Sequence, residues 1–259
     1  MNQLLGLLLA VCALVPVPLD TPPDSKTPPM NDAALEAGTS RAWALLPSAI
    51  LFERNGMSHV LLGGGQRDAK YVATVKAMLN DSWEIKTEDD LITQLEWLKS
   101  EGHRKAFTRR FKEVAKLSEK DLEKSLAKLK DDAERANART EWNNAKRALA
   151  LKGGVIAWDY ARAIALCRWG YAAGMLSEED VWKRVEPFAK ELQAAYASWE
   201  EMNEAFLIGR EAWHPGGNAE TVAAYEKLAK SESSPFKSTP WNLKLVKLDK
   251  PEKRKDPVK

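Results

Sequence analysis

Residues Val155–Ala173, with the sequence VIAWDYARAIALCRWGYAA, decide the fold of this chain. Apolar side chains lie nearly all round the helix that this segment predicts: Ile156 and Cys167 lie on one side, and Trp158 and Trp169 on another. A helix that is apolar on every side belongs in the interior of a protein, where neighbouring elements cover it. The segment therefore predicts the buried central helix of a bundle.

Helical patterns surround this segment. From residue 41 to residue 230, apolar residues recur at spacings of three and four, which is typical of amphipathic helices. Helix start signals of the Ser/Thr-x-x-acid type occur at four positions, which are Thr87, Ser118, Ser177 and Ser198. We expect helices over 41–54, from about Val72 to near Trp83, over 87–102 and over 118–153. Two more follow, one from residue 177 with a bend or break at Pro187 and one over 198–213. The prediction is an all-α, single-domain orthogonal bundle of about eight or nine helices.

Composition excludes several classes of protein. The 259 residues are 44% hydrophobic and 29% charged, with a formal net charge of +2, so no basic excess indicates binding to nucleic acid. The two cysteines cannot form a disulfide scaffold, and the three histidines show no metal-ligand spacing. We expect no metal and no cofactor. The ten tryptophans fall mostly on core-facing helical positions and are interpreted as packing residues.

The two ends of the chain differ from its middle. Residues 1–19 resemble a signal peptide, because Leu4–Val15 is almost entirely apolar, is too short to span a membrane and is followed by prolines. Export is therefore predicted; an uncleaved N-terminal helix in a cytoplasmic protein is the alternative. Residues 20–40 read as a proline-rich disordered spacer, 41–245 as the helical domain, and 246–259 as a basic disordered tail.

The central helix carries three charges that burial makes costly. Asp159 and Arg162 are three residues apart, close enough on a helix to pair. Arg168 points to the opposite side, so its partner must come from another helix. Candidate partners are Glu200, Glu204 and Glu211.

Two interpretations of these polar residues stay open. In the functional one, His103 and Asp159 move protons in a pocket where Arg104, Arg162 and Arg210 hold an anionic substrate. In the structural one, the same groups form a buried ion-pair network that fixes the register of the helices.

Several segments, in one order along the chain, resemble the bacterial domain-of-unknown-function family 1266. They are Arg41-Ala42-Trp43-Ala44-Leu45, Ser82-Trp83-Glu84-Ile85, Gly102-His103-Arg104, Ala157-Trp158-Asp159-Tyr160-Ala161-Arg162, Arg168-Trp169-Gly170-Tyr171, Tyr196-Ala197-Ser198-Trp199, Gly209-Arg210-Glu211-Ala212-Trp213 and Pro240-Trp241. The resemblance implies an α-helical domain and no known activity. It adds Arg168, Tyr196 and Ser198 to the candidate binding residues. Members of this family usually lack a leader. The apolar start and proline-rich spacer of this chain depart from that pattern, so the cytoplasmic location expected of the family does not carry over directly.

Three functional hypotheses follow. A non-enzymatic binding or interaction module is preferred, because no familiar catalytic constellation occurs in the sequence. The second is an enzyme acting on an anionic small molecule through the Asp/His/Arg cluster. The third is a component of a toxin system, either an effector or an immunity protein. The expected partner is accordingly a protein or an anionic small molecule, with neither nucleic acid nor a membrane span.

Overall fold

The computed structural model of this chain describes residues 34–248. The predicted signal peptide, most of the predicted spacer and residues 249–259 of the predicted tail lie outside this range. All the regular elements within residues 34–248 are helices, which confirms the all-α class. In chain order they are α1 (Ser40–Leu45), the 3-10 helix η1 (Leu46–Ser48), α2 (Ala49–Arg54), α3 (Ala69–Trp83), α4 (Glu88–Ser100), α5 (Arg104–Val114), α6 (Glu119–Leu126), α7 (Asp132–Ala150), α8 (Ile156–Ala172), α9 (Glu178–Ala195), α10 (Trp199–Trp213), α11 (Ala219–Lys230) and α12 (Pro235–Ser238).

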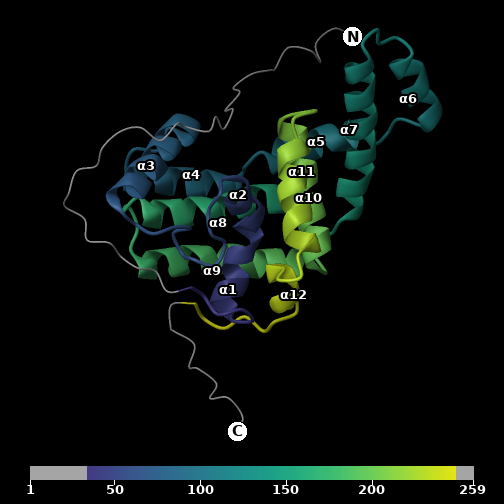
Figure 1. Cartoon of the computed structure of the whole chain (residues 1–259). Coiled ribbons are helices and arrows are strands. Elements are labelled where there is room, and N and C mark those ends of the chain that lie inside the picture. Colours follow the sequence, from purple (N-terminus) through teal and green to yellow (C-terminus); the bar gives the residue numbers. More distant parts are fainter. Residues whose placement is uncertain (1–33, 249–259) are drawn as a thin grey trace.

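Helix α8 is the centre of the fold, as its sequence predicts. Every residue from Ala157 to Ala172 is buried, and α3, α4, α5, α9 and α10 all pack against the helix. Figure 1 shows α9 running alongside α8, while α10 and α11 run across them. A Cβ atom added at Gly209 of α10 would lie 2.3 Å from the Cβ of Trp158, so α10 can approach α8 this closely only through a glycine.

The four predicted capping residues all begin helices. At the start of α4, Thr87 accepts a hydrogen bond from the backbone of Asp90, and the Asp90 carboxylate accepts one from the backbone of Thr87. Ser118, Ser177 and Ser198 accept the equivalent backbone hydrogen bond at α6, α9 and α10. Each such cap contributes about 1 kcal/mol to helix stability.

Two predicted helices are divided. The segment 41–54 forms α1, η1 and α2, because Pro47 has no N–H to continue an α-helical ladder and the chain tightens into a 3-10 turn there. The segment 118–153 forms α6 and α7. Asp131 accepts a hydrogen bond from the backbone of Glu134 and thereby starts α7 as a second capped helix. The predicted count of eight or nine helices is therefore too low.

Two further helical features differ from the prediction. Helix α5 occupies a stretch between Gly102 and Ser118 for which no helix is predicted; its buried residues are Phe107 and Phe111. Helix α9 is continuous through Pro187, so of the predicted bend or break the break does not occur. A proline removes one backbone hydrogen bond, and here the packing of α9 against α1 and α8 holds the helix on both sides of it.

The part of the chain farthest from the centre is the pair α6 and α7. In Figure 1 this pair projects from the rest of the fold. Its own small apolar cluster consists of Leu122, Leu126 and Trp142, separate from the main core. At the other end of the molecule the packed chain continues past residue 245, since Leu248 is 2% exposed and its N–H donates to Glu186. Within residues 34–248, no helix combines the length and apolarity needed to cross a membrane.

Candidate functional site

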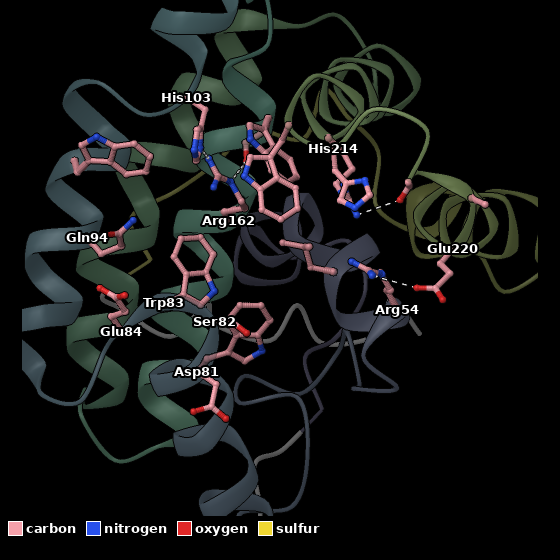
Figure 2. A pocket seen from close by; sticks show the side chains of 18 of the residues that line it. Arg54, Asp81, Ser82, Trp83, Glu84, Gln94, His103, Arg162, His214 and Glu220 are labelled. Carbon is pink, nitrogen blue, oxygen red and sulfur yellow. Dashed lines mark hydrogen bonds and ion pairs between the residues drawn. The ribbon is translucent and has the colours of Figure 1, made fainter. Parts of the chain in front are cut away.

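A cavity of about 590 Å³ opens beside the central helix. Its wall comes from α2, the C-terminal end of α3, α4, α8, α10 and the loop that follows α10. Five of the ten tryptophans line it, which are Trp83, Trp97, Trp158, Trp169 and Trp213. Figure 2 shows this wall, with His103 and Arg162 on one side of Trp83 and Asp81 on the other. The cavity therefore combines flat apolar surfaces with charged groups.

Behind this wall, Asp159 on α8 joins the start of α5 to Arg104 and Arg162. Its side chain is fully buried and accepts four hydrogen bonds: from the backbone N–H groups of His103 and Arg104 at 3.1 and 3.0 Å, and from the guanidinium groups of Arg104 and Arg162 at 3.0 and 2.5 Å. The two backbone donors are among the free N–H groups at the start of α5, so a carboxylate on α8 caps another helix. The predicted pairing of Asp159 with Arg162 is confirmed.

Gly102 makes this close approach possible. Its φ of +58° lies in the left-handed region, and a Cβ atom there would lie 2.0 Å from an Asp159 carboxylate oxygen. Any other residue at this position would be strained and would displace the carboxylate. The turn between α4 and α5 is therefore matched to Asp159.

Arg162 and His103 are the two members of this buried cluster that line the cavity. Arg162 Nη2 lies 3.0 Å from His103 Nδ1, and because arginine can only donate, the Nδ1 atom accepts and the ring proton is assigned to Nε2. Burial and the nearby Arg162 lower the pKa of His103 to about 4, so the imidazole is neutral at pH 7. Burial also lowers the pKa of Arg162 to about 10, against the opposing effect of Asp159, and the guanidinium remains charged.

Arg210 is the cavity cation without an acidic partner among the described residues. It is 5% exposed; its Nη2 donates to the carbonyl of Gly217 at 3.1 Å, while its buried Nη1 has no hydrogen-bond partner. Burial, followed by the charge of Arg54, lowers the pKa of Arg210 to about 10. The indole N–H of Trp158 and the Nδ1 atom of His214, also on the cavity wall, are likewise buried and unpartnered. A buried donor without a partner costs about 1–3 kcal/mol, so Arg210 and the Trp158 indole favour an acceptor oxygen.

The remaining charged residues on the wall fall into two kinds. Arg54 forms an ion pair with Glu220 at 3.1 Å, and Figure 2 shows this pair on the same side as His214. Asp81 and Glu84, at the C-terminal end of α3, have no cationic partner among residues 34–248.

Five of the eight predicted site residues lie outside the cavity wall: Asp159, described above, and Arg104, Arg168, Tyr196 and Ser198. Arg104 donates to Asp159 and to the carbonyls of Leu98 and Lys99 at the end of α4, both at 2.5 Å. The hydroxyl of Tyr196 accepts from the backbone of Ala157 and donates to the carbonyl of Gly154. Ser198 caps α10.

Arg168 is also away from the cavity, and the prediction that an acidic residue of another helix pairs with it is wrong. Its guanidinium donates to the hydroxyl of Ser48 at 2.8 Å and to four backbone carbonyls in the loop after α2, those of Ser58, His59, Leu61 and Leu62. Glu204, one of the predicted partners, pairs instead with Arg147. Five rigidly arranged N–H donors can be satisfied by neutral oxygens, and burial lowers the pKa of Arg168 to about 9.

The structure thus brings together His103, Asp159, Arg104 and Arg162 in one cluster, with His103, Arg162 and Arg210 on a shared cavity. It also shows wall residues that sequence reasoning missed, since the tryptophans were interpreted as packing residues only. A usable signal was present in Trp83-Glu84 and Trp213-His214, which place an indole beside a polar residue at the end of a helix. The carboxylate that the sequence paired with His103 is not on the wall, so the arrangement is better suited to binding than to proton transfer.

Comparison with known proteins places most of this site in a shared region. Residues 78–241, more than half of the chain, match a family model described as protein of unknown function (DUF1266). All the cavity-lining residues except Leu51 and Arg54 lie within that range.

Two relatives come from Escherichia coli (strain K12). The uncharacterized protein YbeR is 26% identical over 163 residues, which cover 62% of this chain and 68% of YbeR. The uncharacterized protein YbeU is 23% identical over 203 residues, which cover 72% of this chain and 85% of YbeU. No solved structure matches the chain. The extent of the family match confirms the resemblance found in the sequence motifs: this chain belongs to the DUF1266 family of proteins of unknown function.

Proposed function

We propose that this protein binds a small molecule that has a flat apolar body and an anionic group, in the cavity beside α8. The proposal rests on the environment of Arg210. This residue lies on the cavity wall and is 5% exposed, and its Nη1 donates to no acceptor among the described residues. A carboxylate or phosphate group against the Arg210 guanidinium supplies a charge of the right sign, and it supplies an acceptor for the buried Nη1 once the side chain turns toward it.

The size and lining of the cavity support the same proposal. A volume of about 590 Å³ falls within the range of about 300–1,000 Å³ that is usual for small-molecule sites. Trp158 and Trp169 are 4% and 1% exposed, whereas the half-buried indoles of Trp83, Trp97 and Trp213 offer surface to a planar ring. Each aromatic contact contributes about 0.5–1.5 kcal/mol beyond the area that it buries. The unpartnered indole N–H of Trp158 is a second donor for an acceptor oxygen.

Catalysis is the weaker alternative. A histidine whose pKa is about 4 is neutral at pH 7 but is a poor base there, and its Nδ1 atom is already occupied by Arg162. Asp159 accepts four hydrogen bonds from within the protein. The cluster therefore serves to position Arg162 and the start of α5, and binding is the function that it supports best.

Matched ligands of known charge test the proposal. Calorimetric titration compares para-methylphenylacetate with its uncharged amide, para-methylphenylacetamide. We expect the acid to bind about tenfold or more tightly, since a charge-assisted hydrogen bond contributes about 1.5–3 kcal/mol. Arg210→Gln removes this preference, while Arg109→Gln, a control at an exposed arginine of α5 outside the cavity wall, keeps it. Equal binding of acid and amide, binding of neither, or an unchanged preference in Arg210→Gln contradicts the proposal.

Export remains part of this proposal. The apolar stretch Leu4–Val15 followed by prolines supports a cleaved leader. Intact-mass measurement of the protein purified from its own host gives the mature N-terminus and, under native conditions, the mass of any retained ligand. A mass that includes Met1–Leu19 contradicts cleavage and favours the cytoplasmic alternative.

A further inference from the structure

The charges on the cavity wall do not balance within the protein. Arg54 pairs with Glu220 at 3.1 Å, and Arg162 pairs at 2.5 Å with Asp159, a carboxylate that it shares with Arg104. Among the described residues this leaves Arg210 as one cation without an acidic partner, and it leaves two carboxylates, those of Asp81 and Glu84, without a cationic partner. Asp81 accepts a hydrogen bond only from the neighbouring Asn80 amide at 2.8 Å. A ligand that carries only negative charge therefore satisfies Arg210 and at the same time meets two uncompensated carboxylates.

Asp81 and Glu84 lie across the cavity from Arg54, which is close enough to Arg210 for its charge to lower the pKa of that residue. In Figure 2, the indole of Trp83 lies between Arg162 on one side and Asp81 on the other, and Glu84 lies beside Gln94. The Trp83 ring lies 5.5 Å from Arg162 Cζ, and Figure 2 shows Asp81 on its other side. An indole face attracts a cation, by about 0.5–1 kcal/mol at an exposed site, so the Asp81 side of Trp83 and the carboxylates favour the same charge.

The fold does not account for glutamate at position 84. Glu84 has a φ of +57° and is the one non-glycine residue with a positive φ within residues 34–248. It ends α3 in the left-handed conformation, where glycine is the least strained residue. Its side chain is exposed, and no hydrogen bond or ion pair to it occurs within the described residues. The Glu84 carboxylate therefore makes no contact within the described residues that competes with a ligand.

From these observations we propose that the ligand is a zwitterion, with an acidic group held at Arg210 and the Trp158 indole N–H, and an ammonium group at the far end of a planar body held by Glu84 and Asp81. This inference rests on the proposed function and specifies its ligand class. The ammonium group pairs with the carboxylates and lies against Trp83, while the acid satisfies the unpartnered donors. Ligands that carry only an ammonium group and ligands that carry only an acidic group each leave one end of the cavity unmatched, which gives selectivity against both.

Three probes with one benzene body separate the two ends. They are para-methylphenylacetate, which carries only the acid, para-methylbenzylamine, which carries only the amine, and para-(aminomethyl)phenylacetate, which carries both at opposite ends. Calorimetric titration measures each against the wild-type protein. We expect the zwitterion to bind about fivefold to tenfold more tightly than the acid, from one partly exposed ion pair and one cation–π contact.

Variants assign that gain to residues. In Glu84→Gln the advantage of the zwitterion falls to about twofold or less, while the affinity for the acid is unchanged or higher, because a repelling charge is removed. Asp81→Asn reduces the advantage in the same direction. Glu96→Gln is the matched control, since Glu96 is an exposed carboxylate on α4 outside the cavity wall, and it keeps the full advantage. Because Glu84, Asp81 and Glu96 are all exposed, we expect these substitutions to leave the far-ultraviolet circular dichroism spectrum unchanged.

The outcomes distinguish this inference from the function on which it rests. If para-methylphenylacetate binds in an Arg210-dependent manner but the zwitterion gains nothing, or keeps its gain in both Glu84→Gln and Asp81→Asn, the ammonium subsite is wrong and the anion site stands. If neither acid binds in an Arg210-dependent manner, the proposed function itself is wrong.

Discussion

Replacement of Asp159 by alanine removes the carboxylate that joins α8 to the start of α5. The side chain is fully buried and accepts four hydrogen bonds, two from backbone N–H groups and two from guanidinium groups. Arg104 is 16% exposed and keeps its two carbonyl partners, so it is partly compensated. Arg162 is 6% exposed and loses its counterion, which leaves a buried cation facing a neutral histidine.

The size of the effect follows from that difference. Removal of one partner from a buried ion pair costs about 3–5 kcal/mol, and we expect Asp159→Ala to fall in this range. A loss of that size is a large part of the roughly 5–15 kcal/mol by which domains are stable. Asp159→Asn keeps the volume and one acceptor oxygen, and we expect a loss of about 1.5–3 kcal/mol.

Urea unfolding followed by far-ultraviolet circular dichroism measures these free energies. The double variant Asp159→Ala/Arg162→Met provides the control, because it removes the cation that the single change leaves without a partner. We expect it to be more stable than the sum of the two single changes by about 1–3 kcal/mol. A loss below about 0.5 kcal/mol in Asp159→Ala, or strictly additive effects in the double variant, refutes the account of Asp159 as a buried counterion.

Three further changes test other parts of the structure. The pKa of His103 is 6.5 in the unfolded chain and about 4 in the fold, so the unfolded state takes up the proton first as the pH falls. The contribution of neutral His103 to the free energy of unfolding is therefore fully present above pH 6.5 and is lost as the pH decreases toward 4. His103→Gln therefore flattens the urea-unfolding profile over this window by about 1–2 kcal/mol, allowing for the partial exposure of the ring, and an identical slope in both proteins contradicts the assigned burial. Gly102→Ala costs more than Gly154→Ala, by about 1 kcal/mol or more in thermal unfolding, because both glycines have a positive φ but only a Cβ at Gly102 strikes Asp159; equal losses exclude that contact as the cause. Glu84→Gly stabilises the protein by about 0.5–1 kcal/mol by relieving the positive φ, and it weakens binding of para-(aminomethyl)phenylacetate; a destabilised Glu84→Gly variant shows that the side chain supports the fold after all.

Features that depend on neighbours along the chain were predictable. The capping residues Thr87, Ser118, Ser177 and Ser198 begin helices because the bonds that they make reach only three residues. Asp159 and Arg162 pair because a helix brings residues three apart onto adjacent positions. The errors in helix boundaries, at Pro47 and at Asp131, are also local, and both residues carry a signal that can be recognised.

Features that depend on distant segments were not predictable. Arg168 is satisfied by carbonyls of residues 58–62, more than one hundred positions away, and nothing in the spacing of its own helix identifies neutral oxygens as its partners. The two carboxylate oxygens of Asp159 cap a helix that begins 55 residues earlier in the chain. Such contacts arise only once the helices have packed at particular distances and rotations.

Local sequence patterns predict the helical class, most helix starts and the identity of the helix that is buried on every side, because hydrophobic periodicity and capping act within a few residues. The cavity that five tryptophans, Arg162 and Arg210 surround becomes visible once the helices have packed. A cavity is the volume that side chains from several helices leave unfilled. That volume is set by how α3, α4, α8 and α10 meet, and no spacing along the chain encodes it.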